Sequence, residues 1–357
     1  DKYKTGKLTP DGEPDPSVFS TEWNREGIQV GTAVATLVRK KQHDKVVDVR
    51  FRNLWGKSKR ADLVAAPLPS TASLYEQVAP SVELGFPFTP MVSGKDYFAW
   101  PSLPELFPRS FPGVKTSRDD VVVDIDRARL VQRMERYFDP QVSHEEMRRI
   151  APGAMESTAR FQAEAVRDAL RKQGFLPESI VRYCYRPFDL RWLYWEPDGV
   201  LLDRPRADYF AQVFEGNGWI EARQKQAITS FGRGYVTRHL ADNFGNGLST
   251  FFPLYLRETA SQGSLFQDSG ALRATPNLTE SGVAYLEALS ATPPETLLHH
   301  AVSVLHSPTY ASENAGALRQ DWPRIPLPKE REALTASAAL GEQVAALLDT
   351  EKDFSGV

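Results

Sequence analysis

Near the end of the chain stand two proline-containing blocks, Leu305-His306-Ser307-Pro308-Thr309-Tyr310 and Trp322-Pro323-Arg324-Ile325-Pro326. The segment 295–305 in front of them is apolar at helical spacing. A residue that precedes a proline is driven out of the helical conformation, so a helix is predicted to end at Ser307. His306 and Ser307 are neighbours, but no Gly-x-Ser-x-Gly turn surrounds them, and we do not expect a catalytic pair here.

Composition limits the class of protein. A chain of 357 residues accommodates two or three domains, and 41% hydrophobic with 25% charged residues is ordinary for a soluble globular protein. The single cysteine, Cys184, excludes an intramolecular disulfide and a cysteine zinc cluster. No apolar run reaches the roughly 20 residues of a membrane helix, and no signal peptide is evident, so we expect no membrane association and a cytoplasmic location.

The kind of basic residue is more informative than the net charge. At −3 the chain is not a general polyanion binder, but arginine outnumbers lysine by 29 to 14. Arginine presents a planar fork to phosphates and to guanine edges, whereas lysine is a hydrated point charge. Codon usage in a GC-rich genome would produce the same excess. The composition therefore permits nucleic-acid binding without establishing it.

Hydrophobic patterning divides the chain into three parts. In residues 1–65, the apolar run 28–40 and the alternating run 46–52 predict two paired strands that end a larger sheet. Residues 66–175 begin with a stretch rich in proline and aromatics and continue into helices near 126–138, 143–150 and 156–173. Residues 176–357 combine arginines and aromatics, with predicted strands near 219–224, 234–237 and 247–256, a helix near 207–214 and a last helix over 331–348.

Chemical motifs are few. The chain has no Gly-x-Gly-x-x-Gly, no Walker loop, no His-x-x-x-His pair and no acid two residues before any lysine. These patterns predict neither a nucleotide cradle nor a metal site, and they do not indicate a nuclease. Asp124, Asp126 and His144 are the residues on which an unrecognised complete enzyme could depend.

Four landmarks carry a family resemblance. Gly27–Lys40 resembles the late strands of an N6-adenine DNA methyltransferase domain, and Gly113–Asp119 resembles a loop that follows such a domain. Tyr185–Arg191 is similar to an Arg-Pro-Phe-Asp-x-Arg block, and the two proline-containing blocks resemble the family's closing block. In this order they resemble the C-terminal part of a type ISP restriction–modification enzyme, or of a related type IIG enzyme or phage-defence methyltransferase.

The resemblance implies a mixed α/β fold. Terminal strands of a Rossmann-like methyltransferase sheet (1–65) would lead through a connector (66–175) into a target recognition domain (176–357). The family's Asn-Pro-Pro-Tyr-like loop and glycine-rich S-adenosylmethionine motif are absent from the sequence. We therefore expect this chain to recognise double-stranded DNA without catalysis or a cofactor of its own. The parent enzyme would use S-adenosylmethionine, and the remaining methyltransferase core would be a partner within the same parent chain.

Candidate contacts follow from this expectation, because phosphate contacts position a protein on a duplex while base-edge contacts read its sequence. No catalytic or metal-binding residue is expected. The candidates for phosphate contacts lie on loops: Lys57, Lys59, Arg60, Lys115, Thr116 and Arg118. The candidates for base contacts lie in turns between strands: Arg204, Arg206, Arg223, Gln224, Arg233, Arg238 and Asn243. Residues expected either to brace the fold or to contact DNA are His306, Ser307, Tyr310 and Arg324.

Two further expectations differ from DNA contact. Arg182, Arg186 and Arg191 are expected to pair with Asp189 and neighbouring acids rather than with DNA. The proline- and aromatic-rich stretch 71–112 favours a second function, protein–protein coupling inside the parent enzyme.

Overall fold

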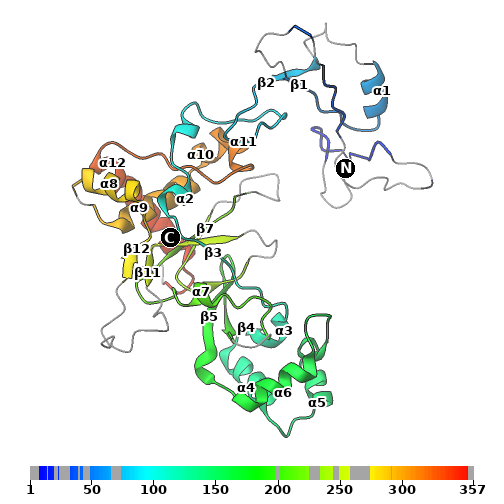
Figure 1. The fold of residues 1–357 in the computed structure, drawn as a ribbon, viewed down its shortest axis with the longest axis vertical. Coiled ribbons are helices and arrows are strands. Elements are labelled where there is room, and N and C mark those ends of the chain that lie inside the picture. The colour runs from blue at the N-terminus through cyan, green and yellow to red at the C-terminus, as the bar shows by residue number, and fades with distance from the viewer. Residues whose placement is uncertain are drawn as a thin grey trace. The chain divides into compact units, whose positions relative to one another are not determined.

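The computed structural model describes most of the chain: residues 8–13, 15–19, 23, 33–38, 41–42, 49–65, 74–197, 201–224, 234–243, 249–257, 274–290 and 292–352. Contacts divide the chain into two compact units, Asp1–Met91 and Val92–Val357, and each is described by itself (Figure 1). Within the described ranges, no helix has the length and apolar character needed to cross a membrane. The three predicted functional parts stay a prediction.

The first unit contains a short antiparallel strand pair and one helix. β1 (Val49–Phe51) pairs with β2 (Glu76–Val78), and α1 (Lys59–Ala65) lies between them in sequence. The predicted pairing of 28–40 with 46–52 is wrong where it can be followed, because residues 33–38 form no strand and are exposed. β1 takes its partner from a segment that carries a buried residue, Val78. Residues 28–32 and 39–40 lie outside the described residues.

The second unit begins with small elements around its proline-rich stretch. The first three elements are η2 (Tyr97–Ala99), α2 (Leu103–Leu106) and β3 (Phe111–Pro112). Ser102 and Glu105 form a capping box at the start of α2. Residues 92–112 thus contribute β3, which is an edge strand of a sheet built mainly from residues 219–253.

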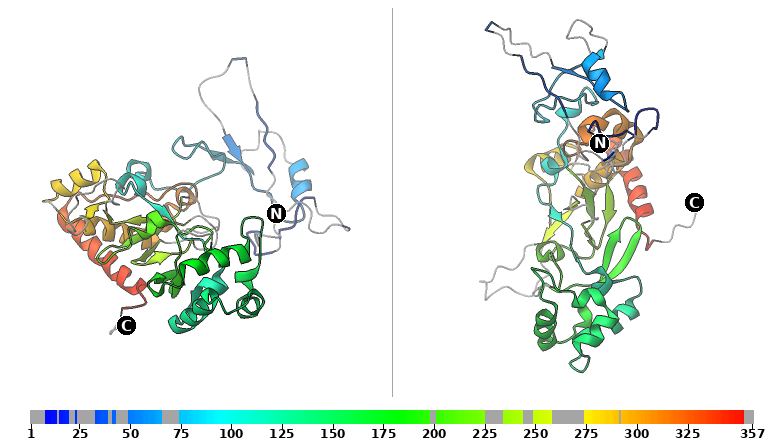
Figure 2. Two further views of the ribbon diagram at one scale, coloured as in Figure 1. Left: turned by 60° about the horizontal axis from the view of Figure 1, so that its bottom comes forward. Right: turned by 90° about the vertical axis from the view of Figure 1, so that its right-hand side faces the viewer.

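A helical part follows β3 (Figures 1 and 2). It contains α3 (Asp119–Val122), α4 (Arg127–Phe138), α5 (His144–Ile150), η3 (Pro152–Met155) and α6 (Ala163–Gln173). Asp126 caps α4 by accepting from the backbone N–H of Ala128 at 2.8 Å, and Ser143 caps α5. The predicted helices near 126–138 and 143–150 are confirmed. The third begins only at Ala163.

A fully buried arginine holds the ends of these helices together. Arg167 Nε donates to the carbonyl of Tyr137 at 2.8 Å, and its Nη2 donates to the carbonyl of Val142 at 3.0 Å. The last carbonyls of a helix have no partner inside it. Arg167 of α6 therefore supplies the hydrogen bonds that the end of α4 lacks.

Two four-stranded sheets form the centre of the unit. The β7 sheet has the order β3-β10-β7-β8 and contains β7 (Trp219–Ala222), β8 (Tyr235–Thr237) and β10 (Thr250–Pro253), all antiparallel. The β5 sheet has the order β4-β6-β5-β9. It contains β4 (Val123–Asp124), β5 (Ile180–Arg186), β6 (Asp189–Tyr194) and β9 (Leu240–Ala241), and β9 runs parallel to β5. The predicted mixed α/β fold is confirmed, and the β5 sheet unites residues on both sides of residue 175.

The remaining elements surround these sheets. They are η4 (Pro177–Ser179), α7 (Ala207–Phe210), β11 (Tyr255–Arg257), β12 (Ala274–Pro276), α8 (Glu280–Ala288), α9 (Pro294–His306), α10 (Pro308–Glu313), α11 (Ala315–Leu318) and α12 (Arg331–Leu348). The last helix has the predicted bounds. Buried Trp219, Tyr209 and Phe251 lie in the core, where the Tyr209 ring stacks on Phe251.

The two proline-containing blocks pack on η2. α9 ends at His306 as predicted, and Ser307 Oγ accepts from the backbone N–H of Tyr310 to begin α10. The Tyr310 hydroxyl donates to the Arg324 carbonyl at 2.8 Å, and Arg324 Nη1 donates to the Trp100 carbonyl at 2.8 Å. His306 Nε2 lies 2.9 Å from the Gly234 carbonyl. These four residues therefore brace the fold.

α12 docks on α9 through a glycine. A Cβ atom built on Gly341 would lie 1.7 Å from the carbonyl oxygen of His299, which is backbone and cannot rotate away. Nearby, buried His300 bridges two segments, with Nδ1 2.8 Å from Ser337 Oγ and Nε2 2.7 Å from the Pro326 carbonyl. Burial lowers the pKa of His300, so the imidazole is neutral at neutral pH.

We expect Gly341→Ala to destabilise the protein although alanine favours a helix by about 1 kcal/mol over glycine. The clash with His299 should outweigh that gain, with a net loss of about 3 kcal/mol or more. Chemical denaturation monitored by circular dichroism measures it. The matched control is Ala339→Gly at an exposed position of the same helix, which should cost only the propensity difference. A Gly341→Ala variant more stable than the wild type would contradict the close packing.

Candidate nucleic-acid interface

The two sheets are joined where the chain passes Gly113. The Val114 N–H donates to the Ala241 carbonyl at 2.8 Å, and the Asn243 N–H donates to the Val114 carbonyl at 3.0 Å. A Cβ atom on Gly113 would lie 2.6 Å from the backbone of Asp242 and Asn243. Only glycine allows the two backbones to approach this closely. The segment after β3 and the segment after β9 are thereby held side by side.

A buried carboxylate stabilises this junction. Asp242 Oδ2 accepts from the Tyr183 hydroxyl at 2.8 Å, and its Oδ1 accepts from Arg186 Nη1 at 2.6 Å. Burial and the adjacent carboxylate raise the pKa of Tyr183 well above its usual value, so the hydroxyl remains a donor. The Arg186 and Arg191 guanidinium groups lie 4.1 and 4.0 Å from the Tyr185 ring centroid.

Arg182, Arg186 and Arg191 all pair with carboxylates of the protein, as expected, but only Arg191 takes Asp189. Arg191 forms a two-point ion pair with Asp189 at 2.8 and 2.7 Å, Arg186 pairs with Asp242, and Arg182 donates to Glu351. One end of the Arg-Pro-Phe-Asp block is therefore fixed by an ion pair within the turn, and Arg186 ties the other end to Asp242. Phe188 has a φ of 63°, and its N–H donates to the Tyr235 hydroxyl at 3.0 Å.

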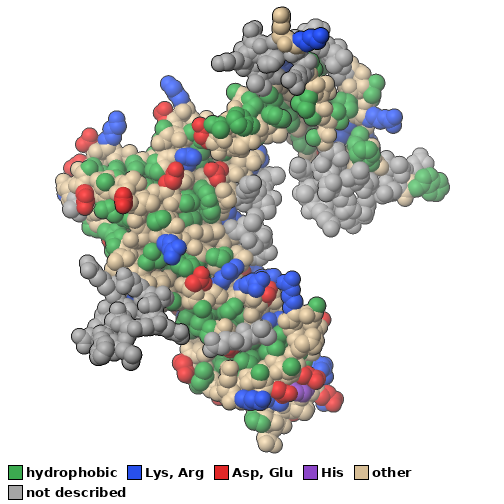
Figure 3. Space-filling model, viewed as in Figure 1, with side chains coloured by type: hydrophobic (Ala, Val, Ile, Leu, Met, Phe, Trp, Pro, Cys, Tyr) green, Lys and Arg blue, Asp and Glu red, His purple; other side chains and the backbone are tan. Residues whose placement is uncertain are grey.

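Beside the junction lies a group of residues that we call the basic rim: residues 113–118, 203–206 and Asn243. Lys115 and Arg204 pair through two backbone hydrogen bonds of 3.1 and 2.8 Å. Lys115 Nζ lies 2.8 Å from Asp203 Oδ2, and its side chain is 58% exposed. Arg204 is exposed. Figure 3 shows Lys and Arg side chains gathered over the region of α7 and α3, which flank the rim in sequence.

Arg206 and Asn243 point the rim toward the junction. Arg206 has a left-handed backbone with a φ of 57°, and its Nε donates to the Gly113 carbonyl at 3.3 Å. Asn243 Oδ1 is buried without a hydrogen-bond partner among the described residues. A buried acceptor without a partner is costly, and it is the kind of atom that a ligand donor can satisfy.

Strand register brings two further candidates to the same end of the β7 sheet. Thr250 lies opposite both Pro112 and Ala222, and Tyr235 lies opposite Glu221. Gly113, Arg223 and Gln224 therefore leave their strands at one edge. Arg223 Nε lies 2.9 Å from Glu221 Oε1, and burial raises the pKa of Glu221 against the opposing effect of Arg223. Gln224 Nε2 donates to Asp321 Oδ1 at 3.1 Å.

Two candidates for phosphate contacts are structural instead. Thr116 is 2% exposed, and its hydroxyl donates to Asp119, so it cannot face a phosphate. Arg118 Nε donates to the Leu201 carbonyl at 2.7 Å, and its guanidinium lies 3.7 Å from the Phe161 ring centroid. Burial lowers the pKa of Arg118. Both side chains fix the loop that carries Lys115.

The candidates of the first unit divide in the same way. Lys59 Nζ lies 2.8 Å from Asp15 Oδ1 and donates to the Pro16 carbonyl at 2.8 Å, and its side chain is 13% exposed. Burial raises the pKa of Asp15, but hydrogen bonds from Lys59 and the Gly56 N–H outweigh this effect and lower it. Lys59 is therefore a structural cation, whereas Lys57 and Arg60 are exposed.

Two candidates for base contacts do not belong to the rim as described. Thr237 pairs with Trp219, so Arg238 lies beyond the opposite end of β8, where it forms ion pairs with Asp349 and Glu351. Arg233 lies outside the described residues. Asp242 and Glu221, which hold the junction and Arg223, were not expected. The partners of Asp242 lie more than fifty residues away in sequence. Glu221 is close to Arg223 in sequence, but its burial is not visible in the local pattern.

Among the described residues, no group of three His, Cys, Asp or Glu side chains could hold a metal ion. Asp124 pairs with Arg133 at 2.8 Å, Asp126 caps α4, and His144 lies 3.4 Å from Asp168, so the residues of the alternative enzyme have structural partners. Cys184 is buried, and burial raises the pKa of its thiol to about 12.

The comparisons with known proteins agree with this architecture. The family model for the Type ISP C-terminal specificity domain matches residues 105–353. A solved structure of the ATP-dependent Type ISP restriction–modification enzyme LlaBIII bound to DNA is similar at a TM-score of 0.54 and 19% identity, covering 77% of this chain and 18% of that one. A cryoEM structure of a DrdV–DNA complex is similar at 0.57 and 19%, covering 82% and 29%. No match was found among curated proteins.

The second unit is thus a mixed α/β domain with a basic rim at the junction of two sheets. Because the family model covers more than half of the chain, the chain belongs to the Type ISP C-terminal specificity domain family. The expected kinship with type ISP enzymes is confirmed. The chain spans 18% of LlaBIII and 29% of DrdV, and the similarity to both is one of fold.

We expect Gly113→Ala to destabilise the junction. The added methyl meets backbone atoms at 2.6 Å, and forcing them apart should cost roughly 1–3 kcal/mol. The thermal midpoint measures this loss. Gly218→Ala is the matched control, because a Cβ atom there meets nothing within 4 Å. Equal midpoints for the two variants would show that the close approach is unimportant.

Proposed function

We propose that this chain is the sequence-recognition region of a restriction–modification enzyme and that its basic rim lies against double-stranded DNA. The observation that carries the proposal is the convergence of Lys115, Arg204, Arg206 and Asn243 at one junction of a Type ISP specificity domain. Two relatives of the fold are DNA complexes, LlaBIII and DrdV. Duplex recognition needs cations for phosphates together with bidentate groups for base edges, and the rim supplies both.

Each rim residue has a role suited to its contacts. Lys115 forms an ion pair with Asp203 but is largely exposed. Its ammonium group can therefore exchange this partner for a phosphate at little cost. Arg206 is oriented by the Gly113 carbonyl. Arg204 is exposed, and together with Arg206 it is our choice for reading base edges. Asn243 is half-buried beside the rim, and its side-chain amide is of the type that pairs with adenine edges.

The parent enzyme would methylate adenine at N6 with S-adenosylmethionine as cofactor and would serve in phage defence in the cytoplasm. In this proposal the methyltransferase core of the same parent chain is the partner that performs the chemistry. The residues of this chain contribute DNA binding and specificity, with no catalysis of their own. Lys57 and Arg60 of the first unit, both exposed, would add phosphate contacts.

A second function, protein–protein coupling within the parent enzyme, is favoured by one stretch of the first unit. Val82, Phe86 and Phe88 are all more than half exposed. Exposed aromatics close together in sequence are typical of a surface that a partner covers.

Arg204→Ala should weaken duplex binding about tenfold or more, because a good bidentate arginine contact is worth ~1–3 kcal/mol. Fluorescence anisotropy with a labelled duplex at several salt concentrations measures the effect. In the same titrations Lys115→Ala should reduce the salt slope by about one. The control is Arg149→Ala, which removes an exposed arginine from α5. Wild-type protein that binds no duplex even at low salt would overturn the proposal.

Replacing Phe86 and Phe88 with serine should leave duplex affinity unchanged within about twofold, since the proposed DNA contacts of this chain do not include these aromatic side chains. The same anisotropy titration provides the measurement. A large loss of DNA affinity would place these aromatics in the DNA interface and would remove the support for coupling.

A further inference from the structure

Glu351 gathers three side chains that carry or can carry positive charge. Its carboxylate accepts from Arg182 Nε at 2.7 Å and from Arg238 Nη2 at 2.8 Å, and it lies 3.0 Å from His239 Nε2. Arg182 comes from β5, whereas Arg238 and His239 come from the turn between β8 and β9. Segments more than fifty residues apart in sequence thus point their donors at one carboxylate.

These donors are held by contacts that do not involve Glu351. Arg182 lies over the Trp192 ring at 4.6 Å from the centroid. Arg238 Nε lies 3.1 Å from Asp349 Oδ2, and the His239 N–H donates to Thr237 Oγ1 at 3.1 Å. Removing the Glu351 carboxylate would therefore leave a donor set that is already arranged around an anion.

Glu351 lies outside the last helix. α12 ends at Leu348, and Glu351 belongs to the turn that follows it. Within this turn the Glu351 N–H donates to Asp349 Oδ1 at 3.1 Å. The glutamate side chain can leave the three donors without unfolding α12, because it lies beyond the end of the helix.

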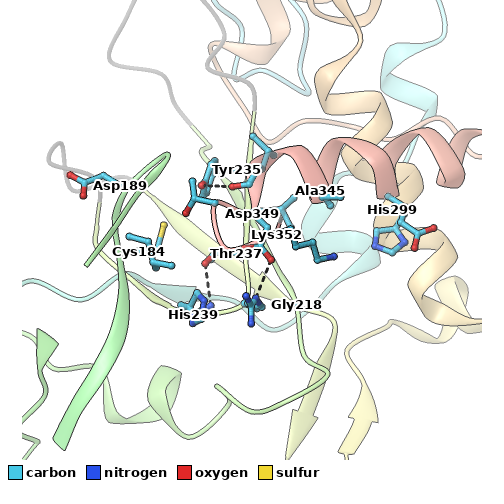
Figure 4. Close-up of a pocket in the computed structure, with 17 residues that line it drawn as sticks. Cys184, Asp189, Gly218, Tyr235, Thr237, His239, His299, Ala345, Asp349 and Lys352 are labelled. Carbon is cyan, nitrogen blue, oxygen red and sulfur yellow. Dashed lines mark hydrogen bonds and ion pairs between the residues drawn. The ribbon is translucent and has the colours of Figure 1, made fainter. Parts of the chain in front are cut away.

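A cavity of about 220 Å³ borders the donors. Arg238, His239 and Lys352 line it, whereas Arg182 and Glu351 do not (Figure 4). Three carboxylates line it as well, those of Asp189, Glu342 and Asp349. Pockets for drug-sized ligands measure about 300–1,000 Å³, so this space suits a small anion better than a whole nucleotide. The side chains of Arg182 and Arg238 are 28% and 49% exposed, so the donors are open to solvent.

We propose that Arg182, Arg238 and His239 form a phosphate-binding site in which the Glu351 carboxylate occupies the place of the phosphate. Guanidinium groups bind carboxylates and phosphates with the same fork geometry, so one group can replace the other. The phosphate belongs to a DNA backbone or is free in solution. A DNA phosphate as ligand rests on the proposed function. In that case the Glu351 carboxylate competes with the DNA phosphate and weakens binding at a region of the domain other than the basic rim.

The test compares Glu351→Gln with Glu342→Gln, which removes the same charge from an exposed residue that lines the same cavity. In duplex titrations, Glu351→Gln should tighten binding several-fold and steepen the salt slope by about one. Glu342→Gln should change both far less. Adding Arg238→Ala to Glu351→Gln should abolish the gain.

A second arm separates the sources of phosphate. Inorganic phosphate should raise the thermal midpoint of the Glu351→Gln variant above its value in chloride at equal ionic strength. If phosphate stabilises this variant while duplex affinity stays at the wild-type value, the site takes free phosphate and the DNA source is wrong. If neither phosphate nor duplex responds to Glu351→Gln, or if Glu342→Gln acts equally, the site is refuted.

The arms also separate this proposal from the proposed function. If Arg204→Ala weakens duplex binding while Glu351→Gln changes nothing in either arm, the rim stands and the phosphate site falls. If no variant binds duplex but phosphate still stabilises Glu351→Gln, the proposed function falls and the phosphate site stands.

Discussion

The second unit depends on the buried carboxylate of Asp242, which ties the end of β9 to Tyr183 and Arg186 of β5. Removing this carboxylate would leave the buried Tyr183 hydroxyl without its acceptor, at a cost of about 1–3 kcal/mol. These hydrogen bonds fix the position of the chain after β9. That position is beside the backbone of Gly113, where backbone hydrogen bonds join the β7 sheet to the β5 sheet.

The basic rim follows from this constraint. Lys115 and Arg204 are paired through their backbones, and Arg206 is anchored on the Gly113 carbonyl. Cations on a rigid junction lose less conformational freedom on binding than cations on a free loop. Thr116 and Arg118, first expected to touch phosphate, fix the segment between them through Asp119, Leu201 and Phe161. The loop therefore combines residues that hold it with residues that can reach a ligand.

Local patterns predicted the helices, and the family resemblance implied the class of fold. The last helix, the break at Ser307-Pro308 and the helices α4 and α5 depend on residues a few positions apart, so the sequence shows them directly. The strand partner of β1 was missed, because pairing depends on a segment about 25 residues further along the chain. For the site, the exposure of Lys115 and Arg204 could be predicted from turn-rich loops.

The burial of Lys59 against Asp15 could not be predicted, and neither could the capture of Arg238 by Asp349 and Glu351, because each involves a distant acid. The role of an arginine or lysine in a turn therefore depends on its acidic neighbours in space. Lys115 stays largely exposed beside Asp203, whereas Arg238 pairs with Asp349 and Glu351.

Hydrogen exchange of this chain with and without a duplex tests the central claim most directly, because it reports every backbone amide in one experiment. The account predicts new protection of residues 113–118, 203–206 and 242–243, with little change in the helices α4, α5 and α6. Protection confined to those helices, with the rim exchanging at its free rate, would contradict the account.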